Sequence, residues 1–471
     1  MIRRLVCLTL LLASGCAGVQ PETSRLPPEA ATGPWPYRPP TVAQTTPRDD
    51  WWRLYDDTAL DALIAQALAS NTDLRAAQAH VDAARALLRE AGSARLPVTT
   101  LSTGESYGRT STATQIADAA GRQAPDLSLF QAGFDMAYEV DLFGRVRRSI
   151  EASRADAQAA AAARDGVQVT IIAETVRDYV QACSLGEQLD VAGQALAIAR
   201  QQADILRRQA AAGGASRLDV ARQDLLVSRT SAALPELEGA RRAVLFALAA
   251  VLGQGPGDVP PAAAACHVIP RPGGPIPVGD GAQLLIRRPD IRQADREMTA
   301  AAARIGMARA ALFPRITLMG SVSSVTTDVA ATGSRPATSF ALGPLVSWTF
   351  PNIAAAQARI AQARASDRAA VATYDGVVLK ALKEVEQAMA LYTAALERER
   401  DLATAQRQAG ITYDLAQGRL NAGSDSRLDV LLAEQGLIEA RLALAAASAA
   451  RAERLVALFK ALGGGWRQAA P

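Results

Sequence analysis

Residues 284–297 read LLIRRPDIRQADRE, and residues 67–80 read ALASNTDLRAAQAH. In each stretch, a helix rich in Ala, Leu and Arg is interrupted by residues typical of a helix N-terminus. These are Pro289 and Asp290 in one stretch, and Asn71 with the two residues that follow it in the other. Proline suits the first turn of a helix, and short polar or acidic side chains bind its free N–H groups. We therefore interpret the two stretches as copies of one element.

Further matches extend this duplication along the chain. Leu74 aligns with Ile291 and Pro97 with Pro314, both at a separation of 217 residues. AAGGASRLDV at 211–220 matches NAGSDSRLDV at 421–430, now 210 residues apart, because the first copy has seven more residues between Pro97 and Tyr138. A period near 210 residues is too long for a solenoid. Each copy is therefore predicted to be a complete structural half.

Each half contains two strand-like runs after a helix that is predicted to end at Pro97 or Pro314. The runs lie within 98–140 and 315–350, and apolar residues alternate there with small or polar ones. Alternation over about 10 residues is typical of a transmembrane β-strand, although a soluble hairpin has the same period. Aromatic residues at the strand ends favour the membrane interpretation. The segments 108–128 and 324–338 are predicted to be polar loops.

A very long helix is expected after each strand pair. No proline occurs between Asp126 and Leu234, or between Asn352 and Ala470. A helix from about Asn352 to Asn421 would be about 100 Å long. Its apolar residues follow a spacing of three and four, which is typical of helix packing: Val371, Tyr374, Val378, Leu382, Val385, Met389, Tyr392 and Leu396. Each long helix is predicted to end in a glycine turn, Gly213-Gly214 or Gly423, and Ser216 or Ser426 would begin the returning helix.

The N-terminus resembles a targeting signal. Arg3 and Arg4 precede a short apolar run, and ASGC ends at Cys16. We predict a lipoprotein signal at 1–15 with lipidation of Cys16; the alternative is an ordinary signal peptide with an incidental cysteine. The predicted organisation then runs along the chain as an extended tether (16–48), the first repeat (49–252), an irregular connector (253–283), the second repeat (284–462) and a C-terminal tail (463–471). Asp49 or Asp50 is expected to cap the first helix.

Composition argues against several other classes of protein. The chain has 50 basic and 47 acidic residues, a balance that gives no reason to expect a nucleic-acid partner. Only two histidines occur, His80 on a polar helix position and His267 beside Cys266, so we predict neither a catalytic site nor a metal site. Beyond Cys7 of the signal and the anchor Cys16, the chain has only Cys183 and Cys266, which are too few for a disulfide framework. Cys183 lies on an apolar helical stripe and is predicted to be a core residue. No cofactor is expected beyond the lipid on Cys16.

Four strands cannot close a barrel, and an open sheet edge cannot lie in lipid because its backbone groups lack partners. The chain is therefore expected to share a barrel with other copies of itself. This argument establishes that the barrel is shared but leaves the number of copies open.

Several motifs resemble the TolC-like outer-membrane factors, and most closely the NodT-like lipoproteins of tripartite efflux systems. The motifs are LLIRRPDIRQAD (284–295), YEVDLFGRVR (138–147) and the two SRLDV segments at 216–220 and 426–430. The resemblance implies a mainly α fold with a membrane β part, in which a homotrimer forms a long α-helical coiled-coil barrel and a 12-stranded β-barrel. Each chain would supply four strands.

The same resemblance implies the partners and the functional residues. A periplasmic adaptor would dock at the helical tips (Gly213, Gly214, Ser216, Gly423 and Ser426), and an inner-membrane transporter would drive export. Asp219 and Asp429 lie six residues after Gly213 and Gly423, where the family has its periplasmic constriction. A ring of Asp429 with an apolar ring of Leu432 would form the gate. The alternative is that both aspartates only cap their helices or form local salt bridges, for instance with Arg217, Arg222 or Arg427.

The sequence therefore predicts a non-enzymatic, lipid-anchored outer-membrane duct that extends into the periplasm and exports small toxic compounds. Two alternatives remain open. One is the same duct in a type I protein secretion system, and the other is a periplasmic coiled-coil lipoprotein scaffold without a pore.

Overall fold

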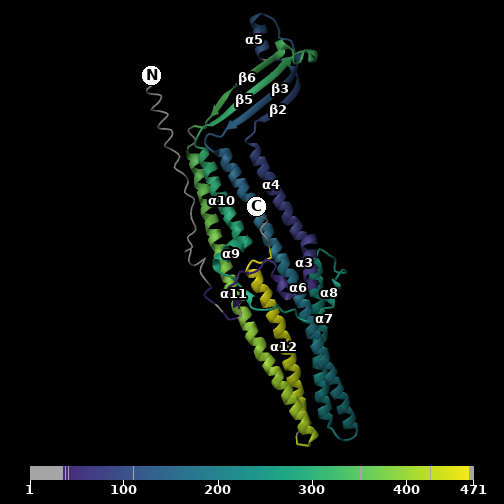
Figure 1. Cartoon of the computed structure of the whole chain (residues 1–471). Coiled ribbons are helices and arrows are strands. Elements are labelled where there is room, and N and C mark those ends of the chain that lie inside the picture. Colours follow the sequence, from purple (N-terminus) through teal and green to yellow (C-terminus); the bar gives the residue numbers. More distant parts are fainter. Residues whose placement is uncertain are drawn as a thin grey trace. The chain divides into compact units, whose positions relative to one another are not determined.

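The computed structural model describes residues 35–37, 39–40, 42–109, 111–350, 353–424 and 426–465. Cys16, the signal at 1–15 and residues 466–471 lie outside this part of the chain. The described residues form two compact units. We call Asp82–Ala159 with Ala294–Thr373 the sheet unit, and residues 35–81, 160–293 and 374–465 the helix unit. Figure 1 labels the elements of both.

The sheet unit contains four antiparallel strands in the order β2-β3-β5-β6. They are β2 (Val98–Gly108), β3 (Leu127–Val140), β5 (Arg315–Thr326) and β6 (Thr338–Ser347). The pairing of β3 with β5, for example Phe134 opposite Val322, joins the hairpin of the first repeat to that of the second. The four predicted strands are thus confirmed, and β2 and β6 form the two edges of the sheet (Figure 1).

The predicted polar loops between these strands contain short helical segments. Helix α5 (Ser111–Ala119) lies between β2 and β3, and two 3₁₀ turns, η3 (Val329–Ala331) and η4 (Arg335–Ala337), lie between β5 and β6. The sequence prediction missed α5 because Ser, Thr and Ala dominate it and its length is below that at which periodicity identifies a helix.

Both repeats begin with a helix pair that breaks at equivalent positions. Helices α3 (Thr58–Ser70) and α4 (Thr72–Ser93) meet at Asn71, and α9 (Gly281–Arg287) and α10 (Pro289–Ala310) meet at Arg288. The expected cap at Asp49 or Asp50 is wrong. A 3₁₀ helix, η2 (Trp51–Tyr55), comes first, and the Asp57 carboxylate caps α3 by accepting the N–H groups of Ala59 and Leu60 at 2.9 and 3.2 Å.

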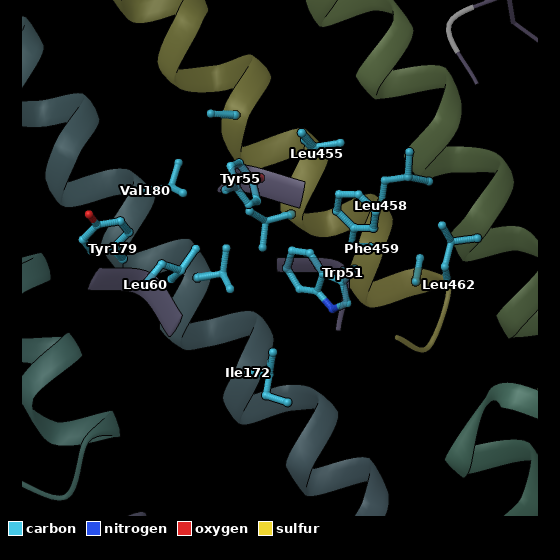
Figure 2. Close-up of a cluster of buried hydrophobic side chains, with 14 of the residues drawn as sticks. Trp51, Tyr55, Leu60, Ile172, Tyr179, Val180, Leu455, Leu458, Phe459 and Leu462 are labelled. Carbon is cyan, nitrogen blue, oxygen red and sulfur yellow. The ribbon is translucent and has the colours of Figure 1, made fainter. Parts of the chain in front are cut away.

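The helix unit is built around the long hairpins of the two repeats. They are α6 (Arg145–Ala211) with α7 (Arg217–Val251) and α11 (Ile353–Asn421) with α12 (Arg427–Ala461). The predicted stripe on α11 is confirmed, because Val378, Val385 and Met389 are fully buried. The core also includes Trp51, whose indole stacks on Phe459 at 4.6 Å, with Leu60 and Ile172 beside it (Figure 2). Removing such large side chains from water supplies most of the stability of this unit.

Part of the predicted tether is folded. Strand β1 (Val42–Ala43) pairs in parallel with β4 (Ile276–Pro277) of the connector. Trp35 is buried, and its indole N–H donates to the Gly279 carbonyl at 2.9 Å. The prediction of an extended tether up to residue 48 is therefore wrong from Trp35 onward, because a buried tryptophan and a strand pair attach this segment to the helix unit. The connector also contains a short helix, α8 (Pro261–Ala264).

Cys183 and Cys266 form a disulfide between α6 and the connector. The sequence analysis expected no disulfide framework and did not predict this bond, because the pairing depends on a tertiary approach of residues 83 positions apart. The chains come very close here: a Cβ on Gly186 would lie 2.4 Å from the Cys266 carbonyl oxygen. The Arg241 guanidinium donates to the Ala264 and Cys266 carbonyls at 2.6 and 2.9 Å, which fixes the connector further.

Within the ranges that the structure describes, no helix combines the length and the apolar character needed to cross a membrane.

Candidate functional site

The two tips of the long hairpins have the same backbone geometry. Gly213 and Gly423 both adopt positive φ, at 79° and 76°, a conformation that glycine adopts without steric cost. The next residue donates its N–H back to the last helical turn, Gly214 to the Gln209 carbonyl at 2.8 Å and Ser424 to the Arg419 carbonyl at 2.9 Å. The glycines thus end α6 and α11 and reverse the chain, as predicted.

A capping box begins the returning helix at each tip. The Ser216 hydroxyl accepts the Asp219 N–H at 3.1 Å, and the Asp219 carboxylate accepts the Ser216 N–H at 3.3 Å. Ser426 and Asp429 repeat this arrangement at 3.3 and 3.1 Å. Hydrogen bonds from Ser426 hold the pKa of the Asp429 carboxyl below its usual range. Both aspartates therefore cap their helices. Their role in a gate stays a prediction.

The candidate gate residues lie at these caps, and their surroundings differ between the repeats. Asp219 has Arg222 one turn further along α7, with nitrogen and oxygen 3.8 Å apart. The position equivalent to Arg222 in α12 is Leu432, whose side chain is 58% exposed. Asp429 is also exposed. One turn after the capping aspartate, the second tip therefore has an exposed apolar side chain where the first tip has an arginine.

The Arg-Arg-Pro-Asp motif joins several elements of the helix unit. Arg288 is buried, and its guanidinium donates to Asp290 at 2.7 Å, to Glu384 of α11 at 2.8 Å and to the Ala461 carbonyl at the end of α12 at 2.9 Å. Ionised hydrogen bonds of this kind are stronger than neutral ones. Arg288 therefore anchors the start of α10 to the second hairpin.

Arg287, the other arginine of the motif, attaches the N-terminal segment. Its guanidinium donates to the Pro47 carbonyl and to Asp49 at 2.8 Å. Asn71 takes the place of Arg288 in the first repeat. Its side-chain oxygen accepts the N–H groups of Asp73 and Leu74 at 2.9 and 3.0 Å, which confirms the predicted cap, and its amide donates to the Val251 carbonyl at 2.8 Å.

The two histidines lie apart from any cluster of metal-binding side chains. His80 is exposed on α4, and the Nδ1 of His267 lies 2.9 Å from Asp190. Among the described residues, no three His, Cys, Asp or Glu side chains are placed to hold a metal ion.

A buried carboxyl close to the second tip was not found from the sequence. Glu434 on α12 is only 2% exposed, and Gln223 on α7 is fully buried. The equivalent of Glu434 in the first repeat is Asp224, whose side chain is 44% exposed and paired with Arg207 at 2.6 Å. The repeat itself could have drawn attention to this position, but a sequence pattern does not show which of two equivalent carboxyls is buried.

Two β-hairpins in one sheet, each followed by a long helical hairpin, define the fold of the TolC-like outer-membrane channels. The chain belongs to the outer membrane efflux protein family, whose sequence profile matches residues 63–254 and 281–464. These two segments correspond to the two repeats.

Individual relatives match over nearly their whole length. The pyoverdine export outer membrane protein OpmQ of Pseudomonas putida is 30% identical over 480 residues, which cover 99% of each chain. SilC of Salmonella typhimurium, named a probable outer membrane lipoprotein, is 27% identical, with 97% of each chain covered. The solved structure of the outer-membrane channel OprN superposes with a TM-score of 0.82 at 31% identity, covering 95% of this chain and 98% of OprN.

Proposed function

We propose that this chain is the outer-membrane duct subunit of a tripartite efflux system. The observation that supports it best is a four-stranded sheet with two unpaired edges and exposed apolar side chains, in a chain whose long helices end in matched tips. On β6, Phe340 is 84% exposed and Leu342 is 72% exposed, although both are large and apolar. Water does not favour such a surface, whereas lipid does.

Closure of the sheet requires other copies of the chain. The edges β2 and β6 present backbone N–H and C=O groups that need partners within a membrane. Pairing β2 of one copy with β6 of the next removes both edges. Three copies supply 12 strands, an even number in the range of known barrels. We therefore propose a homotrimer that encloses one channel.

Lipidation of Cys16 is part of the proposal. SilC, which matches along nearly the whole chain, is named an outer membrane lipoprotein, and this agrees with the ASGC signal. An acyl chain on Cys16 would hold the N-terminal segment at the membrane surface.

The tips are the proposed docking sites for a periplasmic adaptor, which would link the duct to an inner-membrane transporter. Gly213, Gly214, Ser216, Gly423 and Ser426 build two turns that are nearly identical, so one adaptor surface could contact both. The duct itself performs no reaction. The transporter would supply the energy, and Asp429 with Leu432 would restrict passage until docking.

Two experiments test this function. The purified protein should migrate as a heat-modifiable trimer, show β signal in circular dichroism and conduct ions in planar bilayers. A lone helical monomer without conductance would contradict the proposal and support a scaffold.

The second experiment is deletion of the gene. OpmQ is named for pyoverdine and TtgI of Pseudomonas putida for toluene, so the deletion strain should be tested for susceptibility to a panel of chemically different toxic compounds. Unchanged susceptibility with loss of a secreted protein would favour type I secretion instead.

A further inference from the structure

The buried carboxyl of Glu434 lies at the packing surface between the two long hairpins. Glu434 follows the start of α12 at Arg427 by about two helical turns, and Gln223 follows the start of α7 at Arg217 by a similar distance. Helices α7 and α12 pack against each other within the helix unit. The Glu434–Gln223 contact therefore joins the first hairpin to the second close to both tips.

The contact between Glu434 and Gln223 has fewer hydrogen-bond donors than acceptors. The Gln223 amide nitrogen donates to the Ala199 carbonyl of α6 at 3.0 Å, and the Gln223 side chain lies within hydrogen-bonding reach of the Glu434 carboxyl. One oxygen of each side chain, Oε1 of Gln223 and Oε1 of Glu434, is nevertheless buried without a hydrogen-bond partner among the described residues. Two buried acceptors without a donor are unfavourable unless one of them carries a proton.

The neighbouring groups do not neutralise Glu434 as a carboxylate. Tyr413 of α11 is close enough that Glu434 and Asp414 both raise its pKa, after a larger contribution from burial. Gln202 of α6 and Arg441 of α12 also interact with Tyr413. On α7, Asp224 is already paired with Arg207. Within the described part of the chain, no Lys or Arg forms an ion pair with Glu434, so a proton is the cation that suits this site.

We infer that Glu434 is a proton-binding site, and that its protonated carboxyl donates to the Gln223 oxygen and so fastens α12 to α7. The proton comes from solvent water and returns there when the hairpins separate, so the step needs no other reactant. Proton binding at Glu434 does not depend on the proposed function. Only its consequence does, namely that separation of the hairpins beside the tips would release a proton.

The direction of the pH dependence follows from burial. Burial raises the pKa of Glu434 from 4.5 to about 7, and the hydrogen bond from Gln223 opposes this shift only in part. A carboxyl whose pKa is raised by packing stabilises that packing most below its unperturbed pKa. The stabilisation is lost as the pH rises through about 7. The contact should therefore be firm in mild acid and weaker at pH 8.

Hydrogen–deuterium exchange of the full-length protein in detergent tests the site without requiring a channel. We expect protection factors for peptides of α7 and α12 near the contact, after correction for intrinsic exchange, to fall about tenfold between pH 6 and pH 8. Glu434→Gln has an amide that donates permanently, so its protection should match the acidic wild type at both pH values. Asp224→Asn, altered at the equivalent, partly exposed position, should keep the full pH response.

Several outcomes would overturn the inference. They are a wild type whose corrected protection does not change with pH, a Glu434→Gln variant that keeps the change, and an Asp224→Asn variant that loses it. If Glu434→Gln does not fold, Gln223→Met provides a second test. This substitution removes the oxygen that would accept the hydrogen bond from Glu434, so the protection factors should fall at pH 6. Loss of conductance with an intact exchange response would contradict the duct and leave the proton site standing.

Discussion

The two hairpin tips are built from the same residues but have different surroundings. Both have a glycine at positive φ and a Ser–Asp capping box, at Ser216 and Asp219 in one and at Ser426 and Asp429 in the other. Beyond the caps they diverge. Asp219 has an arginine one turn away where Asp429 has Leu432, and the side chain of Asp224 is partly exposed where that of Glu434 is buried.

This comparison shows that local capping and tertiary packing constrain the two copies of a repeat differently. A cap depends on a few neighbouring residues, so each copy must keep it for its own helix to begin. Charge and burial depend on what packs against the hairpin, so the copies can differ there. The second hairpin combines an exposed apolar position, an exposed carboxylate and a buried carboxyl, and it is therefore the better candidate for the part that moves.

The largest effect is expected where the repeats differ most, at the paired helix breaks. Arg288→Ala leaves Glu384 and Asp290 without their shared guanidinium and should lower the free energy of unfolding by about 3 kcal/mol. Asn71→Ala, at the equivalent position, removes a cap and should cost about 1 kcal/mol. Urea unfolding of the detergent-solubilised protein measures both. Arg288→Lys, which keeps the charge but loses the planar fork, should lie between them; equal losses for Arg288→Ala and Asn71→Ala would contradict this difference.

The disulfide between α6 and the connector is the next difference between the repeats, because the second repeat has no equivalent bond. Replacing Cys183 and Cys266 together by Ala should lower the free energy of unfolding by about 2–4 kcal/mol, since the bond closes a long loop in the unfolded chain. The equivalent of Cys183 in the second repeat is Thr393, a buried side chain whose hydroxyl has no partner in the described structure. Thr393→Val should therefore be nearly neutral. A reductant should destabilise the wild type and leave the double variant unchanged.

Removing the capping serine should have the same effect at both tips, whereas the helix breaks and the disulfide distinguish the two repeats. Ser216→Ala and Ser426→Ala should each cost about 1 kcal/mol, because each removes the hydroxyl that accepts one otherwise free N–H. Exchange measurements on the first turns of α7 and α12 would locate the loss. A clearly larger loss at either tip would show that its serine has a role beyond the cap.

The smallest effect should come from the exposed carboxylates, measured as ion selectivity in planar bilayers. Asp429→Asn should weaken cation preference more than Asp219→Asn, because Arg222 already lies near Asp219. Salt screens exposed charges, so the difference should shrink as ionic strength rises. Asparagine keeps an oxygen for the cap, which limits changes in structure. Equal selectivity in both variants and the wild type would remove Asp429 from the gate.

The features that the sequence alone predicted correctly depend on short-range rules. The tandem repeat, the four strands, the long helices with their stripe and the glycine tips all come from periods of two or 3.6 residues and from capping residues within a few positions. The same rules failed for α5, which is short, and for the cap of α3. There Asp49, Asp50 and Asp57 were all chemically suitable, and packing around Trp51 selected Asp57.

Other features depend on which distant segments meet, and only the tertiary structure decided them. Cys183 pairs with Cys266 across 83 residues, and the Trp35 indole donates to the Gly279 carbonyl. Glu434 is buried near Gln223, while its equivalent Asp224 is partly exposed and paired with Arg207. The physical reason is that burial and pairing belong to contacts between helices and connectors. Two copies that share their capping and turn residues can therefore have the same local backbone there and still hold their acidic groups in different environments.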